Sequence, residues 1–150
     1  MMRIYFIVLL LCAGLSAQTL DSVRLETQHK TSITLDKKTK WLFFTASRSG
    51  AKIVQDSFHA LKIDNVWLKK KRAIYIADTH AAPSLIVNMF VLPKMRKYPY
   101  SVGLDSKGDI TQNWQKTKDG VSIFKLKNLK VIKIIQLKDL QSAKLFLKKL

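Results

Sequence analysis

Hydrophobic and polar positions change their spacing several times along this chain, and each spacing predicts a different element. Short apolar runs at 40–46 and 73–77 show no alternation, which is typical of strands buried on both faces of a sheet. Three further segments have strand patterns, and these are 100–104, 121–127 and 131–137. The last two flank Asn128 and therefore predict an antiparallel hairpin.

Two amphipathic helices are predicted, each with a polar N-cap residue in front of it. Ser49 is the expected N-cap of a helix over 51–62, and Asp139 that of a final helix that runs to residue 150. The apolar face of the first helix consists of Val54, Phe58 and Leu61. The apolar face of the final helix consists of Leu140, Ala143, Leu147 and Leu150.

A third helix is expected between two prolines. Pro83 suits the first turn of a helix, and Pro93 is expected to end it, because a proline inside a helix removes a backbone hydrogen bond. Helical spacing marks its apolar face, which consists of Leu85, Ile86, Met89 and Phe90.

The predicted elements follow the order strand, helix, strand, helix, strand, hairpin, helix. This order favours parallel crossover units in the first half and antiparallel strands in the second, within one α/β domain over residues 41–150. Residues 18–40 are polar and mixed, and they predict a flexible lead-in. Within that segment the alternation at 32–35 is typical of a short edge strand.

Residues 1–17 have the layout of a secretory signal peptide, with Arg3 as the positive start and Ile4–Leu15 as the apolar run. That run is too short to cross a bilayer, which needs about 20 residues. Cys12, the only cysteine, lies inside it, so a chain cleaved near residue 17 has no thiol. Leu11 before Cys12 does not fit a lipoprotein signal. We therefore expect a periplasmic or secreted protein without a lipid anchor.

The net charge of the chain is +17, and Arg3 is the only charged residue among the first 17. Basic proteins bind nucleic acid, anionic lipid or acidic glycans, and export disfavours nucleic acid. A lysine-rich proteome would give the same charge without any such partner. Two basic clusters are the densest, and in most proteins such clusters are simply solvent-exposed surface. Their residues are Lys69, Lys70, Lys71, Arg72, Lys94, Arg96 and Lys97. No apolar run after residue 17 is long enough to span a membrane.

Three segments of the predicted domain resemble the thioredoxin fold. Trp41–Ala46 looks like its central first strand, Tyr98-Pro99-Tyr100 like the segment that carries its cis-proline, and 121–150 like its closing hairpin and helix. The resemblance implies a three-layer α/β sandwich, in which a mixed central sheet has helices on both faces. A competing alignment starts the third core strand at Val121 and leaves Pro99 outside the proline position.

The same resemblance places this chain outside disulfide chemistry. Where the family has its Cys-x-x-Cys pair, this chain has Ser49-Gly50-Ala51-Lys52. Without a thiolate there is no nucleophile for disulfide exchange, so the redox activity of the family does not carry over. The resemblance still implies a binding groove, which would be formed by residues 47–52, His80 and 98–100. The segment 77–100 is also similar to a stretch of small bacterial envelope proteins of thioredoxin-like type.

The turn in front of the first helix offers a further candidate site. Backbone amides at a helix start can bind an anion, and Arg48 or Lys52 could assist. Ser47 and Ser49 lie in the same turn, but neither belongs to a Gly-x-Ser-x-Gly nucleophile elbow. We therefore expect Ser49 to cap the helix and not to act in catalysis.

Asp78 and His80 follow the second predicted strand, at the end of a parallel sheet where ligands tend to bind. A histidine with a nearby carboxylate can act as a general base, and in the alternative Asp78 merely caps the next helix. The three histidines are scattered and no cysteine accompanies them, so no metal site and no cofactor are predicted.

Together these patterns predict an exported, non-redox thioredoxin-like protein that acts as a binding or accessory module in the bacterial envelope, with a protein or peptide as partner. An enzyme that uses Asp78 and His80 is one alternative. Electrostatic binding of anionic lipid or glycan through the basic clusters is the other. Salt separates this last alternative from groove binding, because exposed charges are screened.

Overall fold

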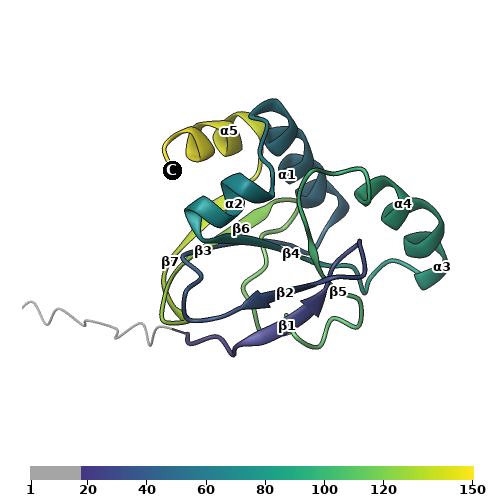
Figure 1. The fold of residues 1–150 in the computed structure, drawn as a ribbon, viewed down its shortest axis with the longest axis horizontal. Helices are drawn as coiled ribbons and strands as arrows, with labels where there is room; N and C mark the ends of the chain where they lie inside the picture. The colour runs from purple at the N-terminus through teal and green to yellow at the C-terminus, as the bar shows by residue number, and fades with distance from the viewer. Residues whose placement is uncertain (1–17) are drawn as a thin grey trace, which may run out of the picture.

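A mixed five-stranded sheet forms the centre of the protein in a computed structural model, which describes residues 18–150 (Figure 1). The expected signal peptide and Cys12 lie outside the described residues. The strands are β3 (Trp41–Thr45), β4 (Ala73–Asp78), β5 (Gly103–Asp105), β6 (Val121–Lys127) and β7 (Lys130–Leu137). Their order in the sheet is β5-β4-β3-β6-β7. β3 pairs with β4 in parallel, as does β4 with β5, while β6 is antiparallel to both β3 and β7. This confirms the predicted change from parallel to antiparallel pairing.

The central strand β3 has a core on each side, as its uninterrupted apolar run predicts. Leu42 and Phe44 point into one core and Phe43 into the other, and all three are fully buried. Side chains of successive strand residues point to opposite faces, so a strand covered on both faces needs apolar residues at every position.

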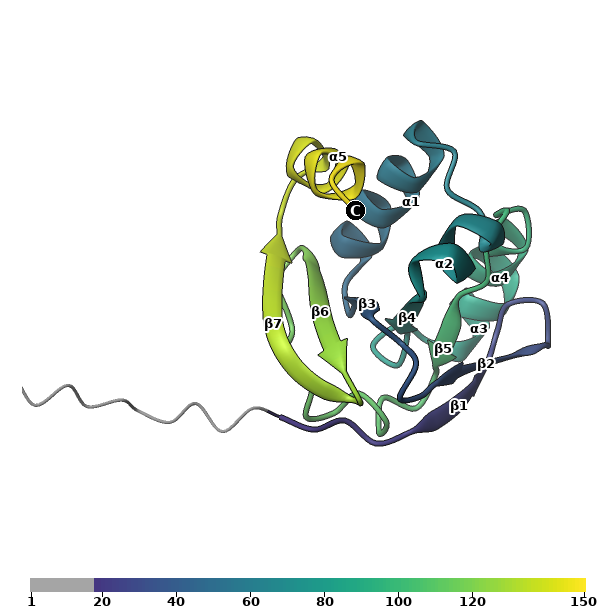
Figure 2. The ribbon, with the colours of Figure 1, turned by 60° about the vertical axis from the view of Figure 1, so that its left-hand side comes forward.

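Three helices cover one face of the sheet: α1 (Arg48–Ala60), α2 (Asn65–Lys71) and α5 (Leu140–Lys148) (Figure 2). Phe58 of α1 packs edge-on against Phe43, with ring centroids 5.5 Å apart. Asp139 caps α5 as predicted, since its Oδ1 accepts a hydrogen bond from Ser142 N–H at 2.8 Å. The helix α2 was not predicted from the sequence.

The other face is covered by an antiparallel hairpin, β1 (Val23–Glu26) with β2 (Ser32–Leu35), and by the loop after β5. The expected strand at 32–35 is confirmed, but the flexible lead-in over 18–40 is wrong, because this segment is part of the second core. Its buried leucines, Leu20, Leu25 and Leu35, pack with Trp114 of the loop. In the described residues this face therefore has a hairpin and a loop where the resemblance implied helices.

Gln28, in the turn between β1 and β2, fastens the hairpin to the chain before β5. Its buried side-chain amide donates to the carbonyl oxygens of Met95 and Tyr100, at 3.2 and 2.7 Å. Its Oε1 accepts from Val102 N–H at 2.8 Å. One glutamine side chain thus satisfies three buried backbone groups, which would each cost free energy if left unpaired.

The segment after β4 differs from its prediction in two respects. It continues from α3 (Ser84–Ile86) through a π-helical turn, η1 (Val87–Val91), into α4 (Leu92–Met95). Pro93 does not end the helix, since it lies in the first turn of α4, where its missing N–H is tolerated. No helix within residues 18–150 combines the length and apolarity needed to cross a membrane.

Candidate functional site

The turn between β3 and α1 has a different cap from the predicted one. Ser47 is the N-cap of α1, since its Oγ accepts a hydrogen bond from Gly50 N–H at 3.0 Å. Ser49 lies inside the first turn, so the prediction of Ser49 as the cap is wrong. Arg48, Ser49 and Lys52 are exposed around this helix start. Lys52 forms an ion pair with Asp56 one turn along the helix, at 3.1 Å.

The turn at 117–120 packs directly against this helix start. A Cβ on Gly50 would overlap the carbonyl oxygen of Gly120, so neither backbone could approach the other if Gly50 carried a side chain. Gly120 immediately precedes β6, the strand next to β3. The alignment that starts the third core strand at Val121 therefore holds, and Pro99 lies outside the position of the cis-proline in the thioredoxin fold.

Tyr98, Pro99 and Tyr100 lie between α4 and β5, whereas the turn at 117–120 is the segment that packs against the start of α1. Tyr100 is 2% exposed, and its ring packs edge-on against Phe58 in the helix-side core, with centroids 5.0 Å apart. Tyr98 stacks on Tyr100, and burial raises the pKa of both phenols above the ordinary tyrosine value. The backbone oxygen of Pro99 accepts from Asn65 N–H at the start of α2. The structure therefore places Tyr100 in the core and leaves Tyr98 half-buried at its edge.

Asp78 and His80 form a close pair at the carboxyl end of β4. Oδ1 of Asp78 accepts from the backbone N–H of His80 at 3.0 Å and lies 2.6 Å from its Nδ1. The side chain of Asp78 is 2% exposed and that of His80 51%. Among residues 18–150, Oδ2 of Asp78 is buried without a hydrogen-bond partner. Because Asp78 contacts Nδ1, Nε2 is the ring nitrogen of His80 that this pair leaves for other partners.

This geometry corrects the alternative in which Asp78 caps the next helix. The N-cap of α3 is Pro83, which makes no side-chain capping bond, so Asp78 acts on His80 instead. Gly108, at φ +73°, lies so close beneath the His80 ring that a Cβ there would collide with it. The loop after β5 thus supports the imidazole from below. No group of three or more potential metal ligands occurs among residues 18–150.

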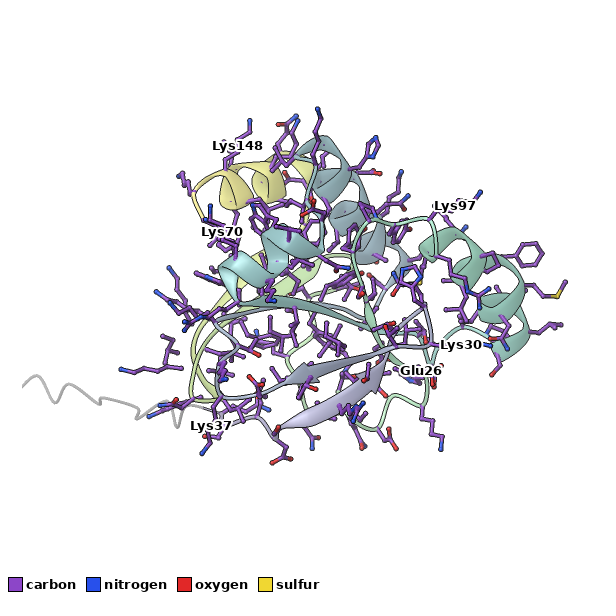
Figure 3. The ribbon with its side chains drawn as sticks, viewed as in Figure 1. Glu26, Lys30, Lys37, Lys70, Lys97 and Lys148 are labelled. Atoms are coloured by element: carbon purple, nitrogen blue, oxygen red, sulfur yellow. The ribbon has the colours of Figure 1, made fainter. Side chains whose placement is uncertain are left out.

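The basic residues fall on two separate parts of the surface. Lys69, Lys70 and Lys71 belong to α2, and Arg72 is its C-cap in the left-handed conformation, at φ 51°. The second cluster lies at the end of α4 and just after it, with Lys94, Arg96 and Lys97. Figure 3 shows Lys70 and Lys97 well apart, so the two clusters do not form one continuous patch.

The sequence predicted an apolar face on α3 and η1, but it did not show that this face is exposed to solvent. Four of its side chains are 43–66% exposed, and we call them the apolar ridge: Leu85, Ile86, Met89 and Phe90. The same helical segment turns Val87 and Met95 inward, where both are buried. The run from 85 to 92 is apolar except at Asn88, so both of its faces are apolar and the spacing alone does not decide which one is buried.

The comparisons with known proteins show the fold. No protein-family model matches the sequence, and no curated protein is similar to it. Among solved structures, the chain is similar to the pneumococcal exposed lipoprotein thioredoxin (Etrx1) of Streptococcus pneumoniae. The TM-score is 0.60 at 14% identity, and 87% of this chain and 100% of that one are covered.

Two further structures support the same assignment. A candidate thiol:disulfide interchange protein DsbE from Chlorobium tepidum has a TM-score of 0.57 at 15% identity, over 89% of this chain and 93% of that one. A candidate protein disulfide isomerase from Bacteroides thetaiotaomicron has a TM-score of 0.56 at 16% identity, over 89% and 86%. The chain thus has a thioredoxin-like fold, as its sequence predicts, although its one cysteine is Cys12.

Proposed function

We propose that this chain is a non-redox binding module of the bacterial envelope, with the apolar ridge as its contact surface for a partner protein. Disulfide exchange needs an attacking thiolate, and the first turn of α1 contains Arg48, Ser49, Gly50 and Ala51 instead. The one cysteine of the chain lies in the segment with the layout of a signal peptide. The fold of an oxidoreductase is thus retained here for binding.

The exposed ridge is the observation that carries this proposal. Large apolar side chains on a protein surface are ordinary when scattered, but neighbouring ones mark interaction sites. Leu85 and Met89 are four residues apart on the helix, as are Ile86 and Phe90, so the four side chains form one surface. Burying a fully exposed side chain of this size contributes about 1.5–3 kcal/mol, and these side chains, which are 43–66% exposed, would each contribute the corresponding part.

Charge near the ridge indicates what kind of protein the partner is. The chain has no acidic residue between Asp78 and Asp105, whereas Lys94, Arg96 and Lys97 follow the ridge directly. The partner surface that fits is an apolar segment flanked by carboxylates. Such a surface gains apolar contact on the ridge and electrostatic complementarity beside it.

Site-specific photo-crosslinking in cells tests this assignment. A photoreactive residue at Met89 is expected to give a discrete protein adduct, which is lost when Phe90→Ser is added. Leu145 on α5 is the matched control, because it is also apolar and 58% exposed. An adduct shared by both positions, or ridge-dependent binding to protein-free anionic vesicles in place of a protein adduct, would contradict the proposal.

The pairing of Asp78 with His80 favours one second candidate, an enzyme that uses His80 as a general base. A buried carboxylate that holds Nδ1 is the arrangement such a base requires. This candidate predicts a pH-dependent activity that His80→Ala abolishes while the protein remains folded. The ridge proposal predicts instead that His80→Ala leaves the crosslinked adduct at Met89 intact.

A further inference from the structure

A cavity of about 540 Å³ opens between α2 and the connection from β2 to β3, at the amino end of the parallel strands. Asp78 and His80 lie at the opposite, carboxyl end of β4, so this cavity is separate from the site described above. In Figure 3, Lys37 of the connection and Lys70 of α2 mark the two segments that border it. Its volume falls within the range of small-molecule sites, about 300–1,000 Å³.

The floor of the cavity is apolar. Leu68 of α2 and Ala73 of β4 are buried, and Ile33 and Ile74 are half-buried beside them. These side chains come from β2, from α2 and from β4, the strand that follows α2 directly in the sequence. An apolar ligand group placed there would remove the exposed parts of Ile33 and Ile74 from water.

The rim of the cavity is positively charged. Lys38, Lys69 and Arg72 line it, and among residues 18–150 none of them forms an ion pair with a carboxylate. Asp36 is the one acidic residue in the lining, and its Oδ1 accepts a hydrogen bond from Lys38 N–H at 2.9 Å. Three cations face one carboxylate, so the rim has an excess of positive charge.

The backbone of Arg72 is tied to the start of β3, while its side chain is exposed. Its carbonyl oxygen accepts from Lys40 N–H at 2.8 Å and from Trp41 N–H at 3.3 Å, which ties the end of α2 to the start of β3. A guanidinium on a fixed backbone suits carboxylate and phosphate groups, because its planar fork can donate two parallel hydrogen bonds.

We propose that this cavity binds a small amphipathic anion. Its carboxylate or phosphate group lies among Lys38, Lys69 and Arg72, and its apolar body rests on Ile33, Leu68 and Ile74. The apolar floor requires a hydrophobic body, and the unpaired cations require a negatively charged head. This site is independent of the apolar ridge, so either proposal can fail without the other.

Isothermal titration calorimetry of the exported protein, at a fixed ionic strength, tests the site with four probes. Octanoate and octyl phosphate carry both parts of the ligand, inorganic phosphate only the head, and octyl glucoside an apolar chain without charge. We expect saturable binding of at least one amphipathic anion, at least tenfold tighter than binding of the other two probes. Which of the two anions binds more tightly identifies the head group.

Two charge-matched double variants make the test specific. Lys69→Gln with Arg72→Gln is expected to weaken binding of the amphipathic anion at least tenfold. Lys70→Gln with Lys148→Gln removes the same charge from residues outside the cavity lining and is expected to leave binding unchanged. All four residues are exposed, so both variants are expected to fold, which a thermal unfolding curve checks.

Three results would overturn the site. Equal weakening by both double variants would mean that net charge alone attracts the anion. Inorganic phosphate that binds as tightly as octyl phosphate would mean that the floor contributes nothing. An absence of saturable binding by all four probes would mean that the cavity takes no ligand of this class.

Discussion

At the scale of single residues, two serines two positions apart have different roles, and this difference can be measured. Ser47→Ala removes the side-chain acceptor of Gly50 N–H and is expected to lower the free energy of unfolding by about 1 kcal/mol. Ser49→Ala changes an exposed residue in the first turn of α1 and is expected to stay within about 0.5 kcal/mol. Urea unfolding of both variants measures the two changes. A larger loss for Ser49→Ala would mean that the helix begins later.

The sequence could predict a cap only where one candidate was present. Asp139 is the single short polar residue in front of the final helix, and it is the cap there. Before α1 both Ser47 and Ser49 have the right chemistry, so the choice depends on where the chain turns. That turn is set by contact with Gly120, which lies 70 positions from Gly50. Gln28 was missed for a similar reason, because its three backbone partners lie more than 60 positions away.

At the scale of elements, the hairpin of β1 and β2 is expected to be part of the cooperative core. Leu35 is fully buried against the sheet, whereas Thr34, next to it on β2, is exposed. Leu35→Ala is expected to cost about 2–5 kcal/mol, because it leaves a cavity among well-packed side chains. Thr34→Ala, the control, is expected to change the unfolding free energy by about 0.5 kcal/mol or less.

Chemical denaturation followed by tryptophan fluorescence suits this comparison, since Trp114 packs in the same core. Equal stability of the two variants would mean that residues 18–40 are a flexible lead-in, as their polarity suggested. The wild-type unfolding curve is expected to show one transition, because the hairpin and the sheet share a core.

Helices and strands were predictable where the apolar pattern of a segment fits only one kind of element. The buried strands β3 and β4 have uninterrupted apolar runs and were located within one or two residues. β2 was predicted from its alternation, whereas β1 has only four residues in a polar segment, and the seven-residue α2 has too few turns to show a period. In the ridge segment both helix faces are apolar, so only the packing of Val87 and Met95 decides which one is exposed.

At the scale of the whole molecule, the fold was predicted correctly, but the predicted groove depended on a strand pairing that local sequence does not decide. Which strand lies next to β3 decides which loop faces the start of α1. Both 100–104 and 121–127 have strand patterns, and local sequence does not say which of them pairs with β3. The structure pairs β6 there, so the turn at 117–120 takes the position that Tyr98-Pro99-Tyr100 was expected to occupy. The pairing of Asp78 with His80 does not depend on strand order, because the two residues are only two positions apart in the sequence.

The charge of the molecule as a whole leads to the last prediction. The net charge is +17 with histidines neutral, and Lys52 with Asp56 is the one lysine–carboxylate ion pair among residues 18–150. Repulsion among the many unpaired lysines opposes the compact state, and added salt screens it. The free energy of unfolding in urea is therefore expected to rise as NaCl increases from about 10 mM to about 300 mM. A fall over this range would mean that attractive pairs dominate.

The two double variants separate this general effect from the proposed anion site. Long-range repulsion depends on how much charge is removed, and both variants remove two positive charges. Their salt slopes are therefore expected to decrease by similar amounts relative to the unmodified protein. Binding of the amphipathic anion should differ between them at least tenfold, because it depends on where the charges lie. If both double variants weakened anion binding as equally as they lowered the salt slope, the basic residues would act only as a diffuse positive surface.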